Sequence, residues 1–129
     1  QGLMNPEHKP DCWLLDGCEY HTVYSQQLGY DGVLHGGGVL TGKWVRLIWN
    51  QTNVGATAEA LALDRRKAIF LATVYNRFGR PLQNTAGQKY ALKLLGALDH
   101  ETVVIKQSLD DAARDRIRRA VEANREFLV

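Results

Sequence analysis

Residues 57–78 read TAEALALDRRKAIFLATVYNRF, and the fold class depends on how this stretch is interpreted. It forms either one long alanine-rich helix, or two strands at 58–63 and 68–75 on either side of a turn at 64–67. Periodicity alone does not separate the two for apolar runs this short. We favour the hairpin, because the aromatic and β-branched residues of its second half prefer sheets and four consecutive charges interrupt any apolar helical stripe.

Three further segments predict strands. Residues 43–49, KWVRLIW, alternate so that Val45, Leu47 and Trp49 share one face. Residues 101–107 are centred on a β-branched run, and the first 30 residues hold apolar and aromatic groups typical of one more strand.

Two segments predict helices. Residues 109–128 place apolar side chains at helical spacing, with charged pairs four residues apart on the other face. Residues 86–98 carry a shorter apolar stripe behind a capping box of Thr85 and Gln88. The expected fold class is therefore α+β: an antiparallel-rich sheet with two helices, the C-terminal amphipathic helix packed on one face.

The composition indicates one globular domain. The chain has 129 residues, of which 45% are hydrophobic and 23% charged, so it can bury a core and lacks the signature of disorder. We expect residues 8–129 to form a single α+β domain. Residues 1–7 predict a flexible arm, whose Gln1-Gly2 start resembles the remnant left when a protease removes an affinity tag.

Apolar runs and cysteine usage bear on location. The longest uninterrupted apolar run is 68–72, far short of the about 20 residues that cross a bilayer, so no membrane association is expected. The chain has two cysteines and no start typical of a secretion signal. These features favour the cytoplasm.

The basic residues are concentrated in the middle of the chain. Between residues 43 and 93 there are nine basic and two acidic residues, whereas residues 1–42 carry a net charge of −4. This predicts an anionic ligand or a nucleic acid as partner, unless the acidic first third neutralises the middle. Aromatic and basic side chains brought together on the sheet would form the binding surface: Lys43, Trp44, Arg46, Tyr75, Arg77 and Arg80.

Two cysteines and two histidines lie within fourteen residues. Zinc is bound by four such side chains, and the candidate ligands are His8, Cys12, Cys18 and His21. Their spacing differs from that of common zinc fingers, and Cys12 is equally explained as a small buried apolar residue. These four residues are therefore the candidate metal ligands, but no cofactor is expected.

A final group could transfer protons. Histidines and carboxylates are the usual acid–base side chains, and the candidates here are Asp16, Glu19, His21 and His35.

The favoured function is a non-catalytic binding or accessory protein for an anionic ligand or partner. The alternative is a small hydrolase-like enzyme that uses His21 or His35 with a carboxylate, with or without a metal. An exposed sheet edge would also allow a homodimer.

Overall fold

The computed structural model describes residues 13–76, 84–104 and 108–129, which fall into two compact units. The first comprises residues 1–68 and the second residues 69–129. Residues 1–7, predicted to be an arm, lie outside the described residues.

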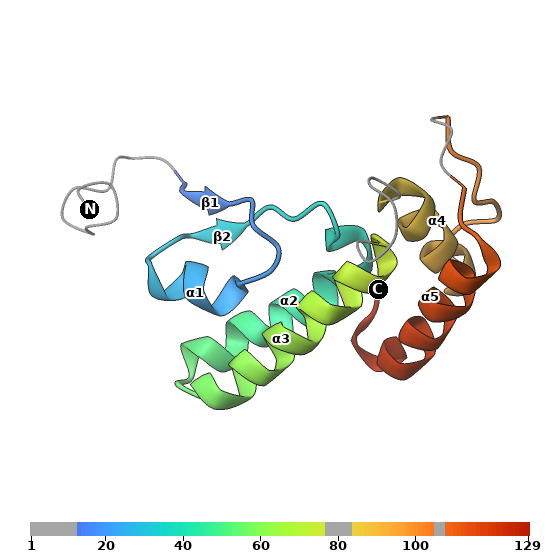
Figure 1. Ribbon diagram of the computed structural model, residues 1–129. Coiled ribbons are helices and arrows are strands. Elements are labelled where there is room, and N and C mark those ends of the chain that lie inside the picture. Colours follow the sequence, from blue (N-terminus) through green and yellow to red (C-terminus); the bar gives the residue numbers. More distant parts are fainter. Residues whose placement is uncertain (1–12, 77–83, 105–107) are drawn as a thin grey trace. The chain divides into compact units, whose positions relative to one another are not determined.

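The first unit begins with a short β–α–β arrangement. Strand β1 (Leu15–Asp16) leads through helix α1 (Thr22–Gln27) to strand β2 (Gly32–Val33). The two strands pair in parallel, with Leu15 opposite Gly32 and Asp16 opposite Val33. Parallel neighbours need a crossover connection, and α1 provides it (Figure 1).

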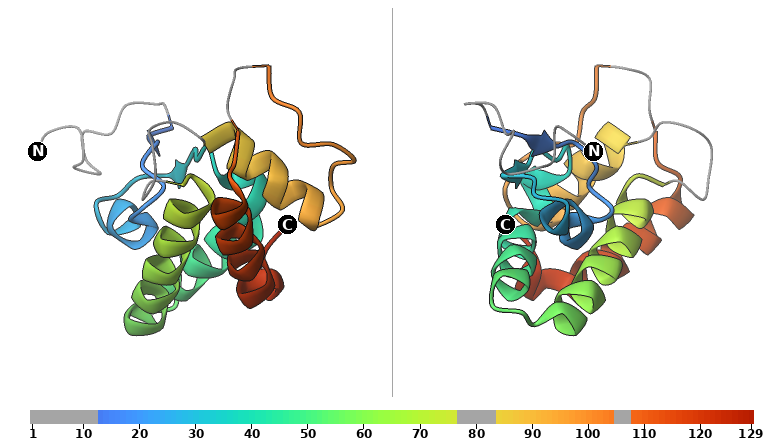
Figure 2. Two further views of the ribbon diagram at one scale, coloured as in Figure 1. Left: turned by 45° about the vertical axis from the view of Figure 1, so that its right-hand side comes forward. Right: turned by 90° about the vertical axis from the view of Figure 1, so that its left-hand side faces the viewer.

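Helices α2 (Gly38–Asn53) and α3 (Thr57–Val74) follow, and α3 continues into the second unit. Figures 1 and 2 show α2 beside the first half of α3. The Arg66 guanidinium lies 5.9 Å from the centre of the Trp44 ring, which joins the two helices.

The hairpin predicted for residues 57–78 is wrong, because α3 runs unbroken across the supposed turn. The four charges do interrupt the apolar stripe, but Asp64 and Lys67 lie three residues apart and form an ion pair, with Nζ 2.9 Å from Oδ1. Both are buried, so they occupy the inner face as a pair while Arg65 and Arg66 remain exposed.

The strand predicted at residues 43–49 is also wrong. These residues lie within α2, where Leu40, Trp44 and Ile48 are fully buried at four-residue spacing. The alternation of Val45, Leu47 and Trp49 does not correspond to burial, because none of the three is fully buried.

The second unit contains the two predicted helices. Helix α4 (Asn84–Leu94) and helix α5 (Asp111–Asn124) pack on each other, and a 3-10 turn, η3 (Arg125–Phe127), extends α5. The Asp110 side chain caps α5 by accepting from the Ala113 N–H at 2.6 Å. Residues 101–104 form no strand, and residues 105–107 lie outside the described residues.

The predicted α+β class with an antiparallel-rich sheet is therefore contradicted. The described residues are mostly helical, and their strands are the two short parallel ones. Helix α5 packs on helix α4. Within the described residues, no helix has both the length and the apolar character needed to cross a membrane.

Candidate functional site at the strand ends

Parallel pairing brings the carboxyl ends of β1 and β2 to one edge. Strand β1 ends at Asp16 and leads to Glu19, and β2 ends at Val33 two residues before His35. In open and closed parallel α/β folds, ligands bind at the carboxyl ends of the strands. This edge is therefore the part of the first unit where a site is expected.

Asp16 is held by donors from its own neighbourhood. Its carboxylate accepts hydrogen bonds from the Ser25 hydroxyl and, at 2.9 Å, from the Cys18 N–H. Partial burial by itself raises the pKa of Asp16, but these hydrogen bonds and the nearby His21 outweigh it, so the pKa lies below its ordinary value. Asp16 is therefore a fixed carboxylate at neutral pH.

Glu19 joins the two strand ends. Its Oε2 accepts a hydrogen bond of 2.7 Å from the N–H of Gly37, just before α2. This contact ties the loop after β1 to the loop after β2. The second carboxylate of the group is thus also fixed in position.

His35 lies in the loop after β2, and its ring nitrogens are unsatisfied within the described residues. Both ring nitrogens are buried, and neither has a hydrogen-bond partner within the described residues. Burial lowers the pKa of His35, as does the positive charge of Lys67, whereas the carboxylates of Glu19, Asp16 and Asp64 oppose the shift. The imidazole is therefore neutral at neutral pH, with one N–H to donate and one lone pair to accept.

Lys67, on α3, is the last member of this group of charged residues. Its side chain is 0% exposed and its ammonium contacts the Asp64 carboxylate and the Thr22 hydroxyl. Asp64 also accepts from the Val23 N–H at 3.0 Å, which fixes the start of α1. Burial lowers the pKa of Lys67, and its acidic partners oppose that effect.

We define the strand-end cluster as Asp16, Glu19, His35, Asp64 and Lys67. With a neutral imidazole it holds three carboxylates and one ammonium, so its net charge is negative. An anion would be repelled there, whereas a neutral or proton-donating polar group would be favoured. The unsatisfied His35 nitrogens are its available hydrogen-bonding positions.

Sequence reasoning named part of this cluster. Of the four predicted acid–base residues, Asp16, Glu19 and His35 belong to it, and His21 lies beside it, with Nδ1 3.8 Å from the Asp16 carboxylate. Asp64 and Lys67 were missed. Their three-residue spacing was the available signal, but it indicates an inward pair only once the segment is known to be helical.

The predicted basic–aromatic surface has no sheet on which to form. Lys43 and Arg46 are exposed on α2, Trp44 is fully buried, and Tyr75 is buried just after α3. The strand face proposed for Lys43, Trp44 and Arg46 does not form, because these residues lie in α2. Arg77 and Arg80 lie outside the described residues.

The predicted zinc ligands are only partly described. Cys18 is a free thiol and His21 is about half exposed, whereas His8 and Cys12 lie outside the described residues. In the part of the chain that the structure describes, no three histidine, cysteine or acidic side chains are grouped as a metal would require.

Comparison with known proteins supports the fold. No protein-family model and no curated protein matches the chain. The structure of dihydrodipicolinate synthase from Bacteroides thetaiotaomicron is similar, with a TM-score of 0.76 and 24% identity. The match covers 91% of this chain and 39% of that TIM-barrel protein, so this chain spans less than half its length.

The class that follows is a portion of a TIM-barrel fold. In such barrels each parallel strand is followed by a helix, as β1 is by α1 and β2 by α2. At this level of identity the likeness carries the fold alone, because one barrel fold supports many unrelated reactions.

Proposed function

We propose that the chain contributes an acid–base site for a small polar substrate to a barrel-type enzyme. The observation that carries this proposal is His35, whose two ring nitrogens are buried without a partner in the described part of the chain, beside fixed carboxylates. Buried polar atoms are nearly always hydrogen-bonded, so an exception at the carboxyl edge of parallel strands favours a ligand.

Each residue of the cluster has a separate task in this proposal. His35 acts as a general base: its neutral imidazole takes a proton from the substrate, and the imidazolium so formed returns the proton in a later step. Glu19 and Asp16 orient the substrate and stabilise positive charge that develops on the imidazole. Lys67 is a positioning residue, because its ammonium is taken up by Asp64 and Thr22.

The proposal concerns part of an active site. In barrel enzymes the catalytic residues come from the ends of several strands, and this chain provides two strand ends. The neighbour's activity as a dihydrodipicolinate synthase is a second candidate, supported only by the match over 91% of this chain. We test the hydrolase-like reaction, because it depends on His35 and the carboxylates of this chain.

Hydrolysis of p-nitrophenyl acetate tests the proposal. We expect His35→Gln to lower kcat/KM by about 100-fold, the usual size of a lost general acid or base. The matched control is His100→Gln, since His100 is exposed beyond α4 and should leave the rate unchanged. Equal rates for the two variants would contradict the proposal.

An anionic partner remains a separate proposal, supported by the exposure of Lys43 and Arg46 three residues apart on α2. It would act away from the negatively charged strand-end cluster. We expect retention on heparin to fall with salt and to weaken in a Lys43→Gln, Arg46→Gln double variant. Heparin retention that changes neither with salt nor in the double variant would exclude an anionic partner.

The free thiol of Cys18 is compatible with the proposed cytoplasmic location.

A further inference from the structure

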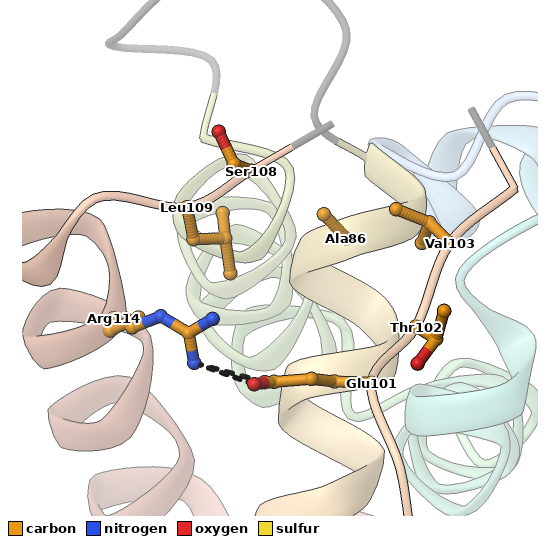
Figure 3. Close-up of a pocket in the computed structure, with 7 residues that line it drawn as sticks. All are labelled: Ala86, Glu101, Thr102, Val103, Ser108, Leu109 and Arg114. Atoms are coloured by element: carbon orange, nitrogen blue, oxygen red, sulfur yellow. Dashed lines mark hydrogen bonds and ion pairs between the residues drawn. The ribbon is translucent and has the colours of Figure 1, made fainter. Parts of the chain in front are cut away.

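A pocket of about 210 Å³ lies in the second unit, separate from the strand-end cluster (Figure 3). It is formed by α4, the segment before α5 and the first turns of α5. Seven residues line it: Ala86, Glu101, Thr102, Val103, Ser108, Leu109 and Arg114. Pockets for drug-sized ligands start at about 300 Å³, so this one suits a smaller molecule.

The pocket has an apolar wall and a charged end. Ala86, Val103 and Leu109 supply the apolar surface, and the ion pair of Glu101 with Arg114 closes one side, as Figure 3 shows. A ligand that contacts both the apolar wall and the charged end must have a short apolar body and one polar group.

Arg114 is held in a fixed orientation. Its Nη1 donates to both oxygens of Glu101, at 2.9 and 3.0 Å, and its guanidinium lies 4.8 Å from the centre of the Tyr90 ring. Within the described residues, Nη2 and Nε make no hydrogen bond, and Figure 3 shows the other terminal nitrogen turned toward Leu109. The guanidinium thus presents unused donors to the pocket without needing to move.

The geometry points to a binding site for a small aliphatic carboxylate. The carboxylate would accept from the unused Arg114 donors, because a planar guanidinium matches a carboxylate. The apolar body would contact Leu109, Ala86 and Val103.

Isobutyrate and isobutyramide provide a matched pair of probes, because they share one shape and differ in charge. Titration of the full chain, followed by amide NMR, should give saturable shifts for isobutyrate at Leu109, Val103 and Ala86, in the millimolar range. Isobutyramide should bind about tenfold more weakly, the difference expected for a hydrogen bond to a charged group.

Arg114→Lys keeps the charge and removes the planar set of donors, so isobutyrate affinity should fall by about tenfold. The matched control is Arg119→Lys, on the exposed part of the same helix, where Arg119 pairs with Asp115. Equal binding of the two probes to the unchanged chain, shifts confined to other regions, or no shifts at all would overturn the inference. This test is independent of the strand-end cluster.

Discussion

His35 and Lys67 are ionisable residues with buried polar atoms that differ in how those atoms are satisfied. Lys67 has an ionic and a hydroxyl partner, and its contacts account for its burial. His35 has none for either nitrogen within the described residues. The partners of Lys67 offset the cost of burying its charge. The unsatisfied His35 nitrogens cost free energy unless a ligand binds them.

The lowered pKa of His35 has a consequence for stability. Below pH 6.5 the unfolded chain takes up a proton at this residue before the folded chain does. The folded state therefore loses stability as the pH falls from 6.5 toward the folded-state pKa, and keeps it above 6.5. We expect His35→Gln to remove this part of the acid destabilisation, measured by urea unfolding at pH 7 and pH 5. An unchanged difference between the two pH values would contradict the assignment.

Lys67→Met is expected to lower the free energy of unfolding by about 3–5 kcal/mol, because it leaves the Asp64 carboxylate buried without its counter-charge. The double variant Asp64→Asn, Lys67→Met should recover much of that loss. Urea unfolding measures both variants. A small effect of Lys67→Met alone would show that Asp64 is not buried as described.

At this scale the sequence predicted three of the five residues of the strand-end cluster. Asp16, Glu19 and His35 could be named because their side-chain types are typical of proton transfer and they lie close in sequence. Asp64 and Lys67 could not, because a run of four charges is normally a solvated turn. Their inward position depends on contacts with Thr22 and Val23, more than forty residues away.

Among the elements, α3 decided the fold class, and like α2 it was predicted to form strands. Alanine and leucine favour a helix in its first half, whereas the aromatic and β-branched residues of its second half favour a strand. Tertiary burial selected the helix, with Phe70, Leu71 and Val74 in the core. Helices α4 and α5 were predictable from their apolar periodicity, although the predicted cap Thr85 lies inside α4 and α5 is capped by Asp110.

The end of α3 also lies very close to α4. A Cβ atom at Gly87 would lie 1.7 Å from the carbonyl oxygen of Val74, so no side chain fits there. We expect Gly87→Ala to destabilise the fold by roughly 3 kcal/mol or more. Gly42 of α2 has open space around it, and Gly42→Ala should stabilise by about 0.5–1 kcal/mol. Thermal unfolding measures both, and similar midpoints for the two variants would contradict this packing.

At the scale of the whole chain, the parallel strand pair leaves large apolar side chains near it exposed to solvent. Parallel sheets are normally covered on both faces, yet Trp13 is 83% and Leu34 72% exposed around β1 and β2. The solved barrel structure that the chain resembles is matched over 39% of its length. A two-residue strand carries almost no periodicity, which is why parallel pairing could not be predicted from the sequence.

The central claim is that His35 lies at the carboxyl edge of that pair, where the charges of Lys67 and of the nearby carboxylates act on it. A pH titration of its imidazole by ¹⁵N NMR tests this most directly. We predict a pKa below 6.5 that falls further in Glu19→Gln, where an opposing negative charge is lost, and rises in Lys67→Met, where a positive charge is lost. A His35 that titrates at 6.5 or above and responds to neither substitution would contradict the account.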